Sequence, residues 1–241
     1  MSSALISAIM LACFGGAGAI PAAAQTPVAA RTVLAEPAAT LPPRNAAIPA
    51  PKESPKPVVF AGLPDATVVE RVRAAIEAIT TLEADFSQTA PSGAISTGKF
   101  YLRRPGLLRF EFEPPSPLLI VATGGTVFVK DEALGTTDSY PVSKTPLKYL
   151  LKKRVELKGA KVVSVDRGTE TVAVTFASDE DETDSALTVV MRAPDLQLKE
   201  WIVRDPKNGV TQVALSNVAM GKALANRLFA APETDSAFLK D

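Results

Sequence analysis

The sequence predicts a mainly β protein with a few helices, built around one large antiparallel sheet. Three observations point to this class. Many segments alternate between apolar and polar residues with a period of two, which indicates strands with one buried face. Turn residues separate these segments at roughly the 8–12-residue spacing of an antiparallel barrel or sandwich. One amphipathic helical pattern precedes the strands, and only a few further residues have helical spacing.

The helical pattern begins at Asp65. Pro64 lies just outside it, and the Asp65 carboxylate is suited to cap the free N–H groups of the first turn. Apolar residues then recur at steps of three and four, at Val69, Val72, Ala75, Ile76 and Ile79. This spacing predicts an amphipathic helix that packs on the core.

The first two strands predicted by alternation form a hairpin around Pro105 and Gly106. Residues 96–104 place Phe100, Leu102 and Arg104 on one face, and Lys99, Tyr101 and Arg103 on the other. In the next strand Leu108, Phe110 and Phe112 share one face. Further strands are predicted at 118–122, 126–130, 136–140, 160–167, 170–177, 186–192, 196–204 and 209–218.

A short helix is predicted over residues 147–151. Thr145 can cap it, and Pro146 is tolerated in a first helical turn. The strands then outnumber the helices that could cover them, and a single sheet of this size must curl or split. A curled sheet can enclose a ligand cavity instead of a solid core.

The composition excludes several classes of site. The chain has no histidine, which removes Ser-His-Asp machinery and imidazole-ligated metal sites, and its single cysteine, Cys13, allows no internal disulfide. The 26 basic residues balance 26 acidic ones, so no field of one sign attracts nucleic acid. The acidic run 179–184 lacks the spacing of an EF-hand and is interpreted as a hairpin loop. We expect no metal and no cofactor.

The N-terminus has the pattern of an export signal. Residues 4–20 are apolar and uncharged, and Ala22-Ala23-Ala24 before Gln25 offers the small residues that a signal peptidase requires. No Lys or Arg precedes the apolar run, which departs from the usual pattern. The apolar run and the small residues nevertheless predict a signal peptide at 1–24, and cleavage after Ala24 would leave a cysteine-free mature chain that starts at Gln25 in an oxidising compartment.

Residues 25–62 are interpreted as a linker, followed by one domain at 63–241. Between Gln25 and Phe60 the chain holds eight prolines and eight alanines in 36 residues, with few large apolar side chains. Such a segment buries too little surface to offset the entropy of ordering it, and its prolines favour extended polyproline II.

Three motifs in residues 63–151 carry a resemblance to a known family. They are LPDATVVERVRAAIEAITTLEADFSQ, STGKFYLRRPGLLRFEFEPPSPLLIVATGG and TPLKYLL. In this order they resemble the periplasmic outer-membrane lipoprotein carrier (LolA-type) family, including a strand with the pattern L-x-A-x-F-x-Q. From 152 to 241 only the strand rhythm and the Leu228-Phe229 pair agree.

The resemblance implies an incomplete antiparallel β-barrel, with short helices that form a lid over an apolar cavity. It also implies a monomeric periplasmic chaperone without enzymatic activity. Its cargo would be an acylated lipoprotein, received from an inner-membrane ABC transporter and passed to an outer-membrane receptor. The absence of histidine and the export signal agree with this function.

Ten residues are candidates for the binding site. In the family, the arginine of the Arg-Pro pair donates to backbone groups of the lid, so Arg104 is the expected lid latch; the other interpretation is a surface salt bridge to Glu111 or Glu113. Arg103 is expected to face solvent. The expected lipid-binding lining is Ile79, Phe86, Phe100, Leu102, Leu108, Phe110, Phe112, Val174 and Phe176. The same residues would also suit an ordinary packed core.

Two other functions remain open at this point. Met10-Leu11-Ala12-Cys13 is a degenerate lipobox, so the chain could be a membrane-anchored lipoprotein of the same fold that acts as a receptor or as a lipid or stress sensor. The Pro/Ala-rich segment would then serve as a tether. A carboxylate-pair hydrolase is disfavoured, because Glu111 and Glu113 alternate toward the outside of the predicted sheet.

Overall fold

A computed structural model of the chain describes residues 57–145, 147–154, 160–178 and 185–232. The predicted signal peptide, Cys13, most of the predicted linker and the acidic run 179–184 lie outside these residues. The export signal therefore remains a prediction, and so does the domain boundary at 62/63.

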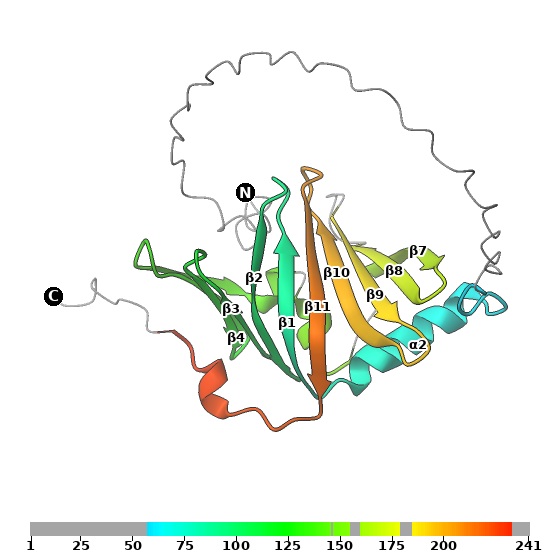
Figure 1. The fold of residues 1–241 in the computed structure, drawn as a ribbon, viewed down its shortest axis with the longest axis horizontal. Helices are drawn as coiled ribbons and strands as arrows, with labels where there is room; N and C mark the ends of the chain where they lie inside the picture. The colour runs from blue at the N-terminus through cyan, green and yellow to red at the C-terminus, as the bar shows by residue number, and fades with distance from the viewer. Residues whose placement is uncertain (1–56, 146, 155–159, 179–184, 233–241) are drawn as a thin grey trace, which may run out of the picture. The chain divides into compact units, whose positions relative to one another are not determined.

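The core of the fold is one antiparallel sheet of eleven strands in the order β6-β5-β4-β3-β2-β1-β11-β10-β9-β8-β7 (Figure 1). The strands are β1 (Thr81–Thr89), β2 (Ile95–Arg103), β3 (Leu107–Phe112), β4 (Leu118–Thr123), β5 (Thr126–Asp131), β6 (Thr136–Pro141), β7 (Ala160–Arg167), β8 (Thr171–Ser178), β9 (Ala186–Arg192), β10 (Gln197–Arg204) and β11 (Val210–Met220). Because β6 and β7 are the two ends of the sheet, it is not closed into a barrel. The predicted incomplete barrel is confirmed.

The alternation in the sequence matches the buried face of the strands. In β1 every second residue from Leu82 to Gln88 is buried, and in β3 Leu108, Phe110 and Phe112 are buried. The register pairs Phe100 of β2 with Phe110 of β3, so their side chains lie on the same face. The strands predicted from period-two patterns all occur, with ends that differ by at most two residues.

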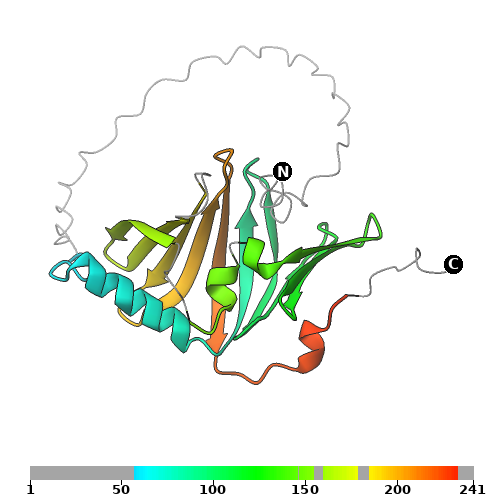
Figure 2. The same ribbon diagram turned by 180° about the vertical axis from the view of Figure 1, so that it is seen from behind.

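Two α-helices lie on the concave side of the sheet, as Figure 2 shows. They are α2 (Asp65–Ala78) and α3 (Lys148–Leu151), and two 3₁₀-helices, η1 (Val142–Lys144) and η2 (Asn226–Phe229), complete the described helices. Helix α2 buries Val68, Val69, Val72 and Ile76 against the sheet. The prediction that Asp65 caps α2 was wrong: Pro64 occupies the N-cap position, and Asp65 is the first helical residue. None of the described helices is both long and apolar enough to cross a membrane.

Aromatic rings show how strongly the sheet curls. Phe110 of β3 and Trp201 of β10 are four strands apart in the sheet, about 19 Å at the usual spacing of neighbouring strands. Their ring centroids nevertheless lie 6.1 Å apart, and Phe100 lies 5.5 Å from Trp201. The rings can meet only because the sheet bends around them, so they lie across the interior from one another.

The outer face of β2–β4 is covered in part by the C-terminal segment, residues 221–232. Arg103 Nη1 donates to the carbonyl of Leu224 at 3.0 Å and to Oδ1 of Asn226 at 2.8 Å, and its guanidinium lies 4.9 Å from the centre of the Phe229 ring. Phe229 is buried. The expectation that Arg103 faces solvent was therefore wrong: Arg103 points to the outer face, but there it binds a segment distant in sequence.

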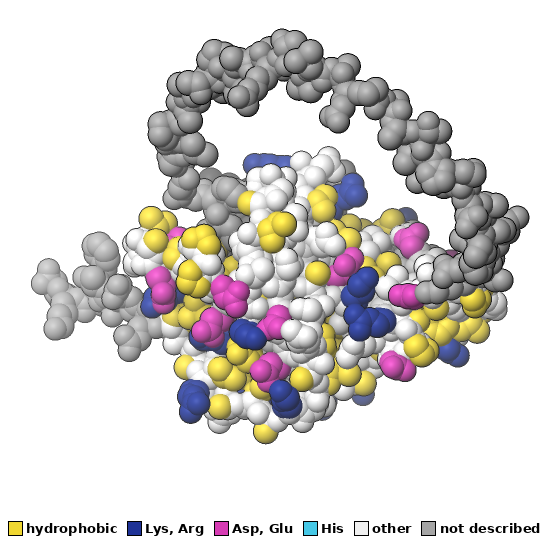
Figure 3. All heavy atoms as spheres, viewed as in Figure 1, with side chains coloured by type: hydrophobic (Ala, Val, Ile, Leu, Met, Phe, Trp, Pro, Cys, Tyr) yellow, Lys and Arg dark blue, Asp and Glu magenta, His cyan; other side chains and the backbone are white. Residues whose placement is uncertain are grey.

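Acidic and basic side chains alternate on the remainder of this outer face, where Figure 3 shows them side by side. Arg109 pairs with Glu111 at 3.0 Å and Lys222 with Glu83 at 3.4 Å, and Lys99 pairs with Asp85. The pKa of the Asp85 carboxyl is lowered mainly by the hydrogen bond that it accepts from the side-chain amide of Asn217. The hydrogen bond from Lys99 lowers it further. Exposed pairs of this kind contribute little to stability.

Replacing Arg103 should release the C-terminal segment. We expect Arg103→Ala to cost about 1–2 kcal/mol of unfolding free energy, because two hydrogen bonds and one cation–π contact are lost. Limited proteolysis of residues 221–232 should become faster, as followed by mass spectrometry. Lys222→Ala is the matched control on the same segment, since its exposed ion pair should change the cleavage rate little. Equal cleavage rates for the Arg103 variant and the wild type would contradict the prediction.

Candidate functional site

The turn between β2 and β3 meets the ends of both α-helices. The backbone N–H of Arg104 donates to the carbonyl of Thr80 at 2.8 Å, just after α2, and the N–H of Gly106 donates to the carbonyl of Leu151 at 2.9 Å, the last residue of α3. Gly106 has φ +82°, a left-handed conformation that glycine adopts without strain. The turn thus places Arg104 between the two helices.

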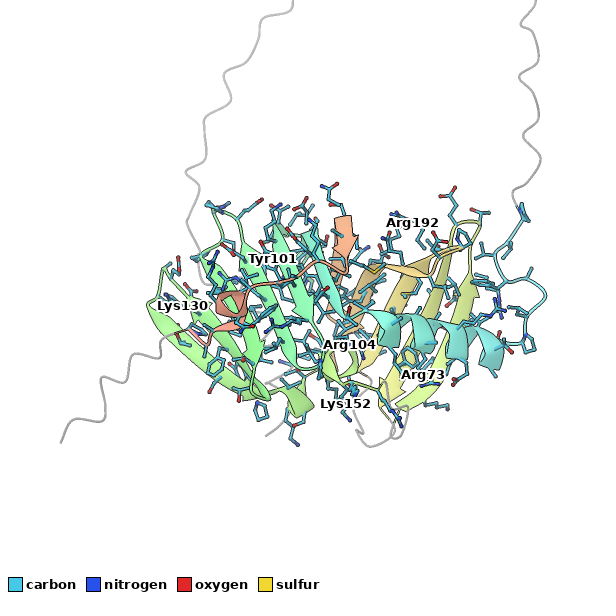
Figure 4. All side chains as sticks on the ribbon, turned by 90° about the horizontal axis from the view of Figure 1, so that it is seen from below. Arg73, Tyr101, Arg104, Lys130, Lys152 and Arg192 are labelled. Carbon is cyan, nitrogen blue, oxygen red and sulfur yellow. The ribbon has the colours of Figure 1, made fainter. Side chains whose placement is uncertain are left out.

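The Arg104 guanidinium joins α2 to the end of α3. Nη1 donates to the carbonyl of Ile76 in the last turn of α2, and Nη2 donates to the carbonyl of Lys152, with Lys153 O a further 3.4 Å contact. Figure 4 shows Arg104 at one end of α2 with Lys152 close by. Carbonyls at helix C-termini lack intrahelical partners and carry partial negative charge, which suits a cationic donor.

The site keeps Arg104 charged in a half-buried setting. Burial lowers the pKa of its guanidinium, while the nearby Glu77 carboxylate raises it. An arginine side chain in a protein nevertheless keeps its proton, so the positive charge is retained. Its Nε is buried without a hydrogen-bond partner. Glu111 and Glu113, the partners considered for a surface salt bridge, instead contact Arg109 and Thr97. The hydrogen bonds of Arg104 to both helices have the geometry expected for a latch. The role of Arg104 in transport remains a proposal.

The residues predicted to line the interior lie together. Each is at most 7% exposed, and all belong to one cluster of buried apolar side chains: Ile79, Phe86, Phe100, Leu102, Leu108, Phe110, Phe112, Val174 and Phe176. That they bind acyl chains is not shown by their burial. Within the cluster, Phe86 makes edge-to-face contacts with Phe110 and Phe112, at centroid distances of 5.1 and 5.0 Å.

The candidate list omitted two parts of this cluster. One is Trp201 of β10, which is buried in the cluster and contacts Phe100 and Phe110. Leu147, Leu150 and Leu151 at α3 are buried in the same cluster. Their spacing of three and four residues was a signal available in the sequence.

Comparison with known proteins decides the family. Residues 77–232 match the family model described as outer membrane lipoprotein carrier protein LolA. The chain belongs to this family. A curated LolA-family relative, an outer-membrane lipoprotein carrier protein from Methylococcus capsulatus, is 36% identical over 77 residues. That match spans 30% of this chain and 37% of the relative.

Solved structures with a similar backbone are distant in sequence. An uncharacterized conserved protein from Thermus thermophilus is 14% identical, with 69% of this chain and 95% of that chain covered and a TM-score of 0.44. A LolA superfamily protein from Nitrosomonas europaea is 9% identical, with 67% of this chain and 96% of that chain covered and a TM-score of 0.38. A chain of the Pseudomonas aeruginosa MucA/MucB complex is 13% identical, with 70% of this chain and 62% of that chain covered and a TM-score of 0.42.

Proposed function

We propose that this LolA-family protein is a periplasmic chaperone that shields the acyl chains of lipoproteins and carries them between membranes. The observation that carries the proposal is the Arg104 contact, which ties α2 and α3 together over a curled sheet lined by apolar residues. Cargo would be received from an inner-membrane ABC transporter and delivered to an outer-membrane receptor. The proposal includes no chemical step and no cofactor.

The physical demand on such a carrier is to bind acyl chains and then to release them. Each acyl methylene exposed to water costs about 0.8 kcal/mol, so the chains must be enclosed during transit. In the structure the interior is occupied by rings in mutual contact, including Phe100, Phe110 and Trp201. Cargo must part these rings, and each aromatic contact regained on release contributes about 0.5–1.5 kcal/mol. Ring packing and the helix latch would both lower cargo affinity and so favour transfer.

The direct test is release of lipoprotein from the inner membrane. The purified chain is added to spheroplasts that hold newly made lipoprotein, and the supernatant is examined for a soluble one-to-one complex. Release that requires ATP supports a carrier. If cargo stays in the membrane, the carrier role is wrong. The N-terminal residue of the mature protein then tests the anchored alternative: a lipidated Cys13 would support a receptor or sensor, whereas Gln25 would not.

Trp201 offers a measurement of where cargo binds. It is the only tryptophan in the chain and is 1% exposed. We expect lipoprotein with brominated acyl chains to quench most of its fluorescence, because bromine would come into contact with the indole in the interior. The same lipoprotein without acyl chains is the control and should leave the emission unchanged. Complex formation without quenching would show that the acyl chains bind away from this interior.

A further inference from the structure

The N-terminal end of α2 is bound to the hairpin between β7 and β8. Arg167 Nη2 donates to the carbonyl of Leu63 at 3.0 Å and to Oδ1 of Asp65 at 2.6 Å. The backbone N–H of Val59 donates to the carbonyl of Gly168 at 2.9 Å. The segment that leads into α2 is therefore fixed to the β7 edge of the open sheet.

Arg167 occupies an environment similar to that of Arg104. Among the described residues, two side-chain nitrogens are buried without a hydrogen-bond partner, and they are the Nε atoms of these two arginines. Each guanidinium also donates to a backbone carbonyl at one end of α2. The Arg167 side chain is 17% exposed while that of its partner Asp65 is 68% exposed, so the arginine lies in toward the protein and the carboxylate stays near solvent.

The two ends of α2 differ in how they are attached. Its C-terminal end continues through Ile79 and Thr80 directly into β1, and the Thr80 carbonyl accepts the N–H of Arg104. Because only Ile79 and Thr80 separate α2 from β1, this end is the pivot about which α2 would rotate. At the rise of a helix, Ile76 lies about 6 Å from Thr80 and Asp65 about 22 Å. A rotation that moves Asp65 by about 8 Å would thus move Ile76 by only about 2 Å.

We propose that Arg167 is a second latch, which holds the N-terminal end of α2 to the β7–β8 hairpin, whereas Arg104 holds the C-terminal end of α2 and α3. A bond far from the pivot resists rotation through a long lever arm, so Arg167 adds to the apolar contacts of α2 in holding the helix against the sheet. Its use in transport rests on the proposed carrier function, in which that swing would admit the acyl chains. Arg167 is a positioning residue; the acyl chains would contact the apolar side chains beneath the helix.

Hydrogen exchange on the full, empty chain tests the latch. The amides to follow are those of residues 69–73, because the first four N–H groups of a helix have no intrahelical partner. We expect Arg167→Gln to raise their exchange about tenfold or more, because the charge-assisted bonds to Leu63 O and Asp65 Oδ1 are lost, while residues 150–152 stay at the wild-type rate. Arg104→Leu should mainly raise amide exchange at residues 150–152. Arg192→Gln is the control, since Arg192 is exposed on the side of the sheet away from α2 (Figure 4).

Two results would overturn the proposal. One is wild-type exchange at residues 69–73 in Arg167→Gln; the other is an equal rise at both helices, which indicates a general loss of stability. If Arg167→Gln does not fold, Asp65→Asn is the second variant, because it alters only an exposed partner. It should raise exchange at residues 69–73 about threefold, less than the full loss of a charge-assisted bond, and no rise would likewise overturn the latch.

A conservative variant separates the latch from a purely structural role. Arg167→Lys retains a cation able to pair with Asp65, so it should restore part of the protection lost in Arg167→Gln. The exchange measurements need no cargo, so they are independent of the carrier function. Failure of the wild type to bind acylated lipoprotein would remove that function and leave the second latch standing.

Discussion

Arg104→Leu should bind acylated lipoprotein more tightly than the wild type and should fail to pass it on. The leucine cannot donate to Ile76 O or Lys152 O, so the closed state loses two charge-assisted hydrogen bonds. Such bonds contribute about 1.5–3 kcal/mol each, and the lower value applies to a half-exposed group such as the Arg104 guanidinium. Apparent affinity rises as the open state becomes more populated, here by about one to two orders of magnitude in Kd.

The measurement is a two-step transfer assay. In the first step the Kd for purified lipoprotein with brominated acyl chains is obtained from quenching of Trp201. In the second step the outer-membrane receptor is added and the transferred cargo is quantified. Arg104→Lys is the conservative control: it keeps the charge but lacks the guanidinium fork that spans both helices, so it should fall between the wild type and the leucine variant. Normal transfer by Arg104→Leu would remove the latch role of Arg104.

Gly98→Val should destabilise the whole domain by about 3 kcal/mol or more. A Cβ at Gly98 would overlap the backbone carbonyl of Glu111 on the neighbouring strand and lie 2.7 Å from Cε1 of Phe86. A backbone carbonyl cannot move without breaking the β2–β3 ladder, and displacement of Phe86 disturbs its contacts with Phe110 and Phe112. Overpacking of a core typically costs about 1–3 kcal/mol, and the clash with a strand backbone adds to that cost.

Urea denaturation monitored by far-ultraviolet circular dichroism would measure this effect. Gly62→Ala is the matched control, because nothing lies within 4 Å of the Cβ position at Gly62 and its φ is not positive. Its unfolding free energy should stay within about 0.5 kcal/mol of the wild type. A Gly98→Val midpoint equal to that of the control would show that the two strands separate at little cost.

The strands and their buried faces could be predicted from the sequence because a strand has a local period of two. Alternation within a single strand was enough to place Leu108, Phe110 and Phe112 on one face, without knowledge of the neighbouring strands. The same holds for Phe100 and Leu102. The family resemblance added β1 and the expected role of Arg104 as a latch. The motifs that carry this resemblance are confined to residues 63–151, and the match to the family model over residues 77–232 confirmed the family.

Other features depended on residues that are distant in sequence. Alternation placed Arg103 on the outer face, but only the fold brings Leu224 and Phe229 onto it. Likewise, Asp65 has the sequence position of a helix cap, yet it pairs with Arg167, 102 residues away.

By itself, the sequence determined which residues form strands, which side chains turn inward and to which family the chain belongs. The tertiary structure alone decided that Trp201 meets Phe110 across the interior, that Arg104 reaches the ends of both helices, and that Arg167 holds the far end of α2. The physical reason is that a strand's face follows from its own periodicity, whereas a contact across the sheet depends on the curl and order of all the strands between its partners.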